Sequence, residues 1–289
     1  MKTVGARAVL LISSPDEKGI VHKVTGVLYR RGLNIVENTE FVDPLSSTFF
    51  MRTEFDGAQV VEEFSKDLVQ ELKSQLSLDA QVRFKSLATT QKNRIVILAT
   101  REAHCLGELL LRHEQGELNA EILGVLSQYE DLGALVRKFN LPFKCIPVQG
   151  DDRLAHEAAI LKEILPKQAD YLVLAKYMRV LSAEFISHFP ERIINIHHSF
   201  LPAFVGKNPY AQAYERGVKI IGATAHFVNE VLDDGPIITQ SVIPINHTQD
   251  ARELARSGRD VEKAVLANAL RLVFEDRVIV HGRRTLVFE

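Results

Sequence analysis

Apolar residues in the first third of the chain change their spacing several times, and each change marks a predicted element. Residues 7–13 are almost continuously apolar, which is typical of a buried strand. From Gly19 the apolar residues recur at helical spacing, and residues 60–76 repeat that pattern. Alternating patterns predict further strands at residues 33–42, 48–55 and 81–84, the first two forming a hairpin. The order βαββαβ predicts a ferredoxin-like domain over residues 1–85.

The rest of the chain alternates regularly between strand and helix patterns. Residues 86–93 are mostly polar and lack periodicity, which indicates a linker. The predicted helices begin near Glu102, Glu130 and Ala155. The predicted strands are residues 95–99, 120–125, 143–148, 171–175, 193–196 and 222–228. This alternation predicts an α/β, Rossmann-like domain over residues 94–289, with a mostly parallel sheet covered on both faces.

Composition narrows the class of protein. The 289 residues are 46% hydrophobic and 25% charged, which is typical of a packed globular chain. A net charge of −2 gives no electrostatic footprint for nucleic acid, and no apolar run reaches the ~20 residues that span a bilayer. The first residues do not resemble a signal peptide. Cys105 and Cys145 form neither a disulfide framework nor a metal-ligand pair, so we expect a cytoplasmic location, with Cys105 a small buried residue.

The most informative stretch is Ile-Asn-Ile-His-His-Ser-Phe-Leu-Pro at residues 194–202. Asn195 and His197 are two apart at the end of an apolar run, so in a strand they point the same way, and His198 is expected to point the other way. An amide can stabilise an oxyanion, and an imidazole can move a proton near neutral pH. Asp233 or Asp234, in a later Asp-Asp-Gly turn, can supply a carboxylate that orients the imidazole or a water. Chemistry alone does not choose between the two.

The pattern Asn-Ile-His-x-Ser-x-Leu-Pro, followed by Asp-x-Gly-x-Ile-Ile, resembles the signature of the folate-dependent formyltransferase family. The resemblance implies that Asn195, His197 and Asp233 are catalytic, and it selects Asp233 over Asp234. It implies no metal and no redox cofactor. Taken singly, each residue has a plainer interpretation, such as a strand-end cap for Asn195.

The doubled histidine, together with Val-Leu-Ala-Lys-Tyr-Met-Arg-Val-Leu at residues 173–181, resembles the family members that hydrolyse 10-formyltetrahydrofolate to tetrahydrofolate and formate. The resemblance implies a role in supplying formate for purine synthesis and in balancing the one-carbon folate pool. Lys176 and Tyr177 are candidates to contact the folate glutamate tail. For His226 the alternative is a hydrogen-bonded core histidine. The substrate-binding residues implied are Arg179, Val180, Leu181, His198 and His226.

The loop after the first strand of the second domain bears on the acceptor. Family members that formylate glycinamide ribonucleotide have a Gly-rich turn there, which cradles the substrate phosphate at a helix N-terminus. Residues 99–107 contain no glycine cluster, and Glu102 would repel an anion. Water is therefore the expected acceptor. The alternatives are formyl transfer to an unidentified amine and a non-catalytic folate or amino-acid sensor.

The N-terminal domain resembles an ACT domain in its length, its element order and the Asp-x-x-Gly that follows its first strand. The resemblance implies an amino-acid effector such as glycine or methionine. It also implies pairing between subunits and hence a homo-oligomer, specifically a tetramer. An exposed sheet edge that tends to pair agrees with this. The effector-binding residues implied are Asp16, Gly19, Asn34 and Ile35.

Overall fold

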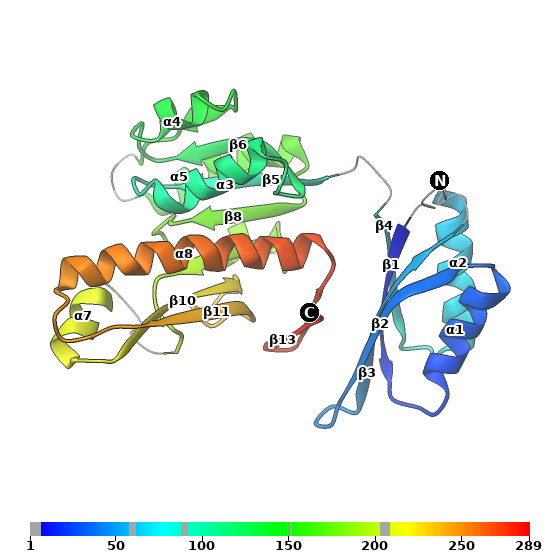
Figure 1. Cartoon of the computed structure of the whole chain (residues 1–289). Helices are drawn as coiled ribbons and strands as arrows, with labels where there is room; N and C mark the ends of the chain where they lie inside the picture. Colours follow the sequence, from blue (N-terminus) through cyan, green and yellow to red (C-terminus); the bar gives the residue numbers. More distant parts are fainter. Residues whose placement is uncertain (1–6, 58–61, 88–91, 149, 151, 203–208) are drawn as a thin grey trace. The chain divides into compact units, whose positions relative to one another are not determined.

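The computed structural model describes residues 7–57, 62–87, 92–148, 150, 152–202 and 209–289. The chain divides into two compact units, residues 1–91 with 288–289 and residues 92–287 (Figure 1). Residues 60–61 of the predicted second helix and residues 88–91 of the predicted linker lie outside the described residues. The flanking strands extend into the predicted linker from both sides, at Ser86 and at Asn93.

The first unit is a four-stranded antiparallel sheet with the strand order β2-β3-β1-β4 and two helices. Alternate residues of β1, including Leu10 and Ile12, pack with Val24 of α1 and Leu68 of α2, because successive strand residues face opposite sides. Gly19 takes a φ of 92° just before α1, a backbone conformation that glycine adopts at little cost. The predicted βαββαβ order is confirmed by the elements β1 (Arg7–Pro15), α1 (Ile20–Arg30), β2 (Asn34–Asp43), β3 (Thr48–Asp56), α2 (Glu62–Gln75) and β4 (Gln81–Ser86).

The second unit contains a seven-stranded sheet with the order β11-β10-β9-β8-β5-β6-β7. The pairs among β5 to β9 are parallel, whereas β10 and β11 are antiparallel, so the predicted mostly parallel sheet is confirmed. The elements up to β9 are β5 (Asn93–Ala99), α3 (His104–Glu114), β6 (Ala120–Ser127), α4 (Gly133–Arg137), β7 (Phe143–Cys145), α5 (Arg153–Ile164), η1 (Leu165–Lys167), β8 (Tyr171–Ala175), α6 (Ala183–Ser187) and β9 (Ile193–His197). They are followed by α7 (Pro209–Arg216), β10 (Ile220–Phe227), β11 (Ile237–Pro244), α8 (Ala251–Phe274), β12 (Val278–His281) and β13 (Arg284–Val287).

Helices cover both faces of this sheet. Ile95 and Ile97 of β5 pack with α3 and the long helix α8 on one face, and Val96 and Leu98 pack with α5 and α6 on the other. A strand buried on both faces needs apolar residues at every position, which explains the continuous apolar run in β5. No helix among the described residues is long and apolar enough to cross a membrane.

Several boundaries differ from the predictions. Strand β7 ends at Cys145 rather than near residue 148, since Pro147 has no amide hydrogen to continue the ladder. Helix α3 begins at His104, which leaves Glu102 ahead of the helix. Neither β11, nor α8, nor the β12–β13 hairpin was expected from the apolar pattern, and α8 proves to support one face of the sheet.

Candidate active site

Polar side chains from two neighbouring strands gather at the carboxyl end of β9. The antiparallel pairing of β9 with β10 places Asn195 opposite His226 and His197 opposite Thr224. Residues directly opposite each other share a face of the sheet, so the amide and both imidazoles lie on one side. Thr224 then holds the chain that follows β9, because its hydroxyl accepts from the Leu201 amide and donates to the Ser199 carbonyl.

The loop between β10 and β11 brings a carboxylate to this group. Asp233 Oδ1 lies 3.3 Å from His197 Nδ1 and 3.9 Å from His226 Nε2. Asp234 turns away and accepts a hydrogen bond from Arg283 at the sequence-distant end of the unit. The Asp234 side chain is partly exposed. The structure therefore places Asp233, and not its neighbour, beside the catalytic candidates.

A glycine fixes the course of that loop. A Cβ at Gly235 would lie 1.7 Å from the Phe227 carbonyl oxygen, so no other residue fits without movement of the backbone. Asp233 itself has a φ of 55°, in the left-handed region that non-glycine residues seldom adopt. The position of the carboxylate thus depends on a close backbone approach at the end of β10.

Hydrogen bonds set the protonation of His226 and the orientation of Asn195. His226 Nδ1 lies 2.8 Å from the Phe227 carbonyl oxygen, which can only accept, so Nδ1 carries the hydrogen. His226 Nε2 can then accept from Asn195 Nδ2 at 3.2 Å. Burial lowers the pKa of His226, which favours this neutral ring. Both ring nitrogens are therefore engaged, and His226 orients the Asn195 amide.

His197 presents one unpaired nitrogen to the site. Its Nδ1 faces Asp233, and its buried Nε2 has no hydrogen-bond partner among the described residues. Burial alone would raise the pKa of Asp233, but the hydrogen bond from His197 and the nearby imidazole charges hold it below its usual value. An ionised Asp233 keeps the Nδ1 hydrogen of His197 in place, so Nε2 is left to meet a ligand. A buried polar atom without a partner calls for such an explanation.

His198 does not point to the opposite face, so that expectation is wrong. Strand β9 ends at His197, and the alternation ends with it. The two rings stack instead, with centroids 5.0 Å apart and planes at 29°. Burial, and then the charge of Lys176, lower the pKa of His198 to about 4, so the ring is neutral at pH 7.

These groups line a pocket of about 260 Å³. Arg179, Val180 and Leu181 contribute the segment after β8, and one guanidinium nitrogen of Arg179, Nη1, is buried without a hydrogen-bond partner among the described residues. Ser182 ends this segment as the cap of α6, and buried Glu157 accepts hydrogen bonds from its amide and hydroxyl. A mostly apolar slot with a few fixed polar groups is typical of a small-molecule site. The pocket thus brings together all eight residues predicted to act on or bind the substrate.

Lys176 and Tyr177, the candidates to contact the folate glutamate tail, are buried but line this same pocket, so that contact stays a prediction. Their exposed fractions are only 4% and 2%. Lys176 Nζ lies 3.2 Å from an oxygen of Glu262 on α8, a residue that sequence analysis did not identify. Glu262 also accepts a hydrogen bond from Tyr210 on α7. The signal that could have found Glu262 is an acidic residue on the apolar stripe of an amphipathic helix.

One group of described residues has the spacing of metal ligands. His104, Cys105 and Glu262 offer atoms that all lie within 4.8 Å of one another. Burial strongly raises the pKa of Cys105, which keeps it a thiol and so a poor ligand. The Lys176 ammonium already neutralises the Glu262 carboxylate. The donor set therefore does not suit a metal ion, and Cys105 is the small buried residue that the sequence predicted.

The residues predicted to bind an effector are not assembled by one chain. Asp16 and Gly19 follow β1, which ends opposite the first residue of β3. Asn34 and Ile35 begin β2, which starts opposite the last residue of β3. Since β3 has nine residues, the two pairs are about 27 Å apart along the sheet. Helix α1 returns the chain to the far end of the sheet, so a site containing all four residues would require a second chain.

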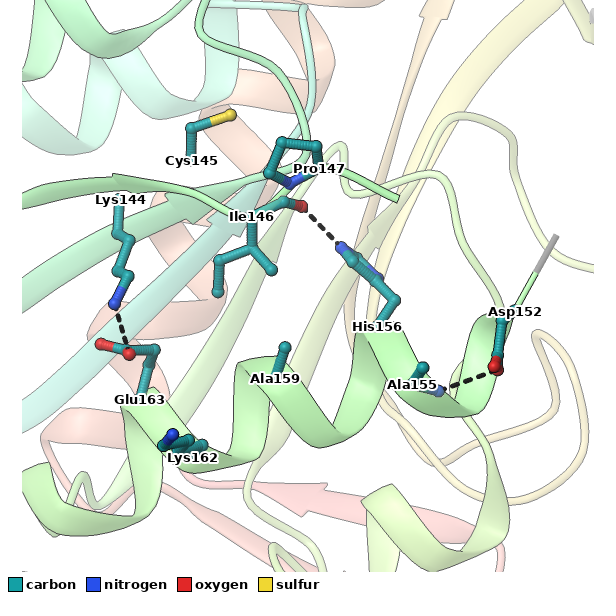
Figure 2. Close-up of a pocket in the computed structure, with 10 residues that line it drawn as sticks. All are labelled: Lys144, Cys145, Ile146, Pro147, Asp152, Ala155, His156, Ala159, Lys162 and Glu163. Carbon is teal, nitrogen blue, oxygen red and sulfur yellow. Dashed lines mark hydrogen bonds and ion pairs between the residues drawn. The ribbon is translucent and has the colours of Figure 1, made fainter. Parts of the chain in front are cut away.

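A second pocket, of about 430 Å³, lies between β7 and α5 at the edge of the sheet (Figure 2). Four of its ionisable groups are engaged with one another or with the backbone. Lys144 pairs with Glu163, His156 contacts the Ile146 carbonyl oxygen, and Asp152 caps α5. None of the predicted catalytic or substrate-binding residues lines it, so the pocket at β9 remains the candidate site.

Comparisons with known proteins bear on the family of this chain. Residues 93–270 match the family described as Formyl transferase, and residues 8–72 match the ACT domain. The chain is 48% identical to formyltetrahydrofolate deformylase of Haemophilus influenzae, over 97% of this chain and 99% of that protein. It is 50% identical to the Escherichia coli K12 protein of the same name, over 97% of this chain and 98% of that protein. A crystal structure of a formyltetrahydrofolate deformylase from Pseudomonas syringae superposes with a TM-score of 0.94 at 39% identity, covering 100% of this chain and 96% of that one.

Proposed function

Because this chain belongs to the formyltransferase family and also contains an ACT domain, we propose that it hydrolyses 10-formyltetrahydrofolate to tetrahydrofolate and formate. Relatives that match along nearly their whole length are named formyltetrahydrofolate deformylase. The observation that carries the proposal is the His197–Asp233 pair, which leaves a buried imidazole nitrogen unpaired beside the Asn195 amide. These are the groups that addition of water to a formyl carbon requires.

The folate lies in the pocket with its pterin against Arg179, Val180 and Leu181. This arrangement directs the formyl oxygen toward Asn195. The Asn195 amide has two hydrogens, and one is donated to His226 Nε2. The second is available to the formyl oxygen, which gains negative charge as the carbon is attacked. A single oriented donor of this kind lowers the barrier by about 3–4 kcal/mol.

Asp233 and His197 act on the water. The Asp233 carboxylate, ionised because His197 stabilises it, accepts a hydrogen from the attacking water. Protonated His197 donates from Nε2 to the developing oxyanion. A bond forms between the water oxygen and the formyl carbon, and the bond from that carbon to N10 breaks. N10 takes up the proton that the water gave to Asp233, tetrahydrofolate leaves, and formic acid loses its remaining proton to give formate. Side chains and water supply every group that these steps need.

The test is to mix the protein with 10-formyltetrahydrofolate in the absence of any amine and to follow tetrahydrofolate and formate together. Equal release of both products is expected. Formate release that requires an added amine would replace hydrolysis by formyl transfer. The names of the full-length relatives do not favour that alternative. The released formate would supply purine synthesis and help to balance the one-carbon folate pool.

The ACT domain supports a proposal for regulation. We propose that an amino acid such as glycine or methionine binds where two chains meet, since one chain separates Asp16 from Asn34. The edge strand β2 exposes Val36, Phe41 and Val42 at about two fifths of their surface, and such edges tend to pair. A homo-oligomer is therefore proposed, specifically the tetramer that the resemblance to ACT-domain proteins implies, and light scattering would measure its mass. A cytoplasmic location is proposed because both cysteines are free thiols.

Removing residues 1–85 tests this proposal. The truncated protein is expected to fold, because the second unit has its own core. It is expected to hydrolyse the substrate but to lose any response to glycine or methionine. Activity is measured with and without each amino acid for both proteins. An identical response after truncation would place the effector site outside the first domain.

A further inference from the structure

A cluster of polar side chains lies beside His198, and the mechanism above does not use it. This Glu262 cluster comes from four parts of the second unit. Glu102 and His104 lie at the carboxyl end of β5, and Lys176 follows the neighbouring strand β8. The other members, Tyr210 on α7 and Glu262 on α8, complete it. The cluster therefore lies over the strand ends next to β9, where ligands of such sheets bind.

The cluster is internally satisfied. One Glu262 oxygen accepts from the Tyr210 hydroxyl at 2.5 Å, and the other lies 2.8 Å from His104 Nε2 and 3.2 Å from Lys176 Nζ. Glu102 lies 3.8 Å from the same ammonium. Burial alone would raise the pKa of Glu262, but the His104 hydrogen bond and the Lys176 charge bring it to about 2. Glu262 is thus an ionised carboxylate whose two oxygens are both engaged.

The Tyr210 ring packs against helix α8 at a position where α8 has a glycine. A Cβ at position 258 would lie 2.2 Å from the Tyr210 ring, so Gly258 is what lets the ring rest on the helix. Four residues later, Glu262 accepts the hydroxyl hydrogen. The Tyr210 ring centroid is 6.3 Å from that of His198, which in turn stacks on His197. Three rings therefore form a continuous row that ends at the catalytic imidazole.

We infer that the Glu262 cluster closes the acceptor side of the active site, so that water but no larger amine reaches the formyl carbon. This inference rests on the proposed function, which places folate in the pocket with its pterin against Arg179. Of the five cluster residues, only Lys176 also lines that pocket. The nucleophile must approach from a side that folate does not occupy. The row of rings meets the pocket at His197 and His198 and leads away from it at Tyr210, which does not line the pocket.

Size and charge both contribute to the exclusion. An amine attacking the same carbon would form a new C–N bond, break the bond to N10 and pass its proton to N10, using the same Asn195 and Asp233. The catalytic groups therefore do not by themselves select water. The two negative charges of Glu102 and Glu262 exceed the single positive charge of Lys176, so the cluster repels the phosphate of a phosphorylated amine. The Tyr210 ring, fixed at both Gly258 and Glu262, disfavours an uncharged one.

The experiment measures how the formyl group is partitioned between water and an amine. Wild type, Tyr210→Ala and Gly258→Ala are each given 10-formyltetrahydrofolate with glycinamide or hydroxylamine, and formate and N-formyl product are quantified. Tyr214→Ala is the control, because Tyr214 lies on the same helix but is half exposed. The ratio of N-formyl product to formate is expected to rise about tenfold or more in both test variants and to stay at the wild-type value in the control.

Gly258→Ala displaces the Tyr210 ring without removing any ionisable group. It therefore tests whether the cluster excludes amines even if Tyr210→Ala does not fold. A folded test variant that loses hydrolysis without gaining N-formyl product would overturn the inference and make the cluster purely structural. Wild type that formylates glycinamide would overturn it as well. Failure of the proposed function is a separate result, since wild type would then release no formate without an amine.

Discussion

Gly235→Ala should reduce catalysis although residue 235 contacts no substrate. The added Cβ would lie 1.7 Å from the Phe227 carbonyl oxygen, and real Cβ atoms essentially never come closer than 3.0 Å to such an atom. The loop must therefore move by roughly 1.3 Å at this point, the difference between those distances. Asp233, two residues earlier, is 3.3 Å from His197 Nδ1, already near the limit for a hydrogen bond.

A displacement of that size would separate the carboxylate from the imidazole. Misplacement of a catalytic group by 1 Å can cost about 10²-fold in rate, which corresponds to roughly 2.7 kcal/mol of barrier. We expect kcat to fall by about that factor. We also expect some loss of stability, since overpacking costs about 1–3 kcal/mol. The backbone angles do not oppose the substitution, because Gly235 does not have a positive φ.

The assay is steady-state formate release, together with thermal unfolding followed by circular dichroism. Gly107→Ala is the matched control, since a Cβ there meets nothing within 4 Å and lies inside helix α3. Alanine should stabilise that helix by up to about 1 kcal/mol and leave kcat unchanged. A folded Gly235→Ala protein with wild-type kcat would refute the argument that this turn positions Asp233.

Three other predictions follow from the same geometry. Asn195→Ala and His197→Ala should each lower kcat and kcat/KM together by about 10²–10³-fold; a change confined to KM would contradict their transition-state role. Asp233→Asn should abolish hydrolysis while folate binding is retained. Asp234→Asn should have only a small effect on activity and stability, because a partly exposed ion pair contributes at most about 1 kcal/mol. Reversed effects in paired kinetic assays would mean that the wrong carboxylate is assigned. The folded-state pKa of Glu262, about 2, lies below its usual value of 4.5, so the stability that ionised Glu262 contributes is complete above pH 4.5 and is lost as pH falls toward 2. The difference in melting temperature between wild type and Glu262→Gln should therefore shrink from pH 6 to pH 3. A difference that stays constant with pH would argue against this linkage.

The parts of the fold that were predicted best are strands whose apolar residues form one uninterrupted run. β5 (Asn93–Ala99) is buried on both faces, and its apolar run, residues 95–99, ends where the strand ends. The chain after residue 230 was predicted least, although signals were present there. Asp250 and Glu253 form a capping box at the start of α8, and apolar residues follow at helical spacing. Strand β11 is largely half-buried or exposed, and its three central residues, Thr239, Gln240 and Ser241, interrupt the apolar pattern, so the strand signal is weak.

The candidate site shows which relations a sequence can carry. The period of a strand places Asn195 and His197 on one face, and the structure agrees. The period does not apply beyond the strand, which is why the placement of His198 was wrong. Asp233 and Asp234 are equivalent by composition, and the approach of Gly235 to β10 separates them. Glu262 lies far along the chain from its partners, so only the packing of α8 reveals its role.

Part of the backbone strain of this chain lies at the catalytic pocket, where it bears on how the side chains are held. Eight non-glycine residues have a positive φ in the described part of the chain, and three of them line the catalytic pocket: Lys176, Met178 and Asp233. Each such residue costs about 1–3 kcal/mol and persists only where its surroundings enforce it. Thr100 does so for Lys176 by donating to its carbonyl oxygen at 2.7 Å, and Gly235 does so for Asp233. Two of the three strained residues therefore carry the charges that face His197 and Glu262. At Asp233, which acts on the attacking water, backbone stability is lost where a charge must be fixed before the substrate arrives, as electrostatic stabilisation of a transition state requires.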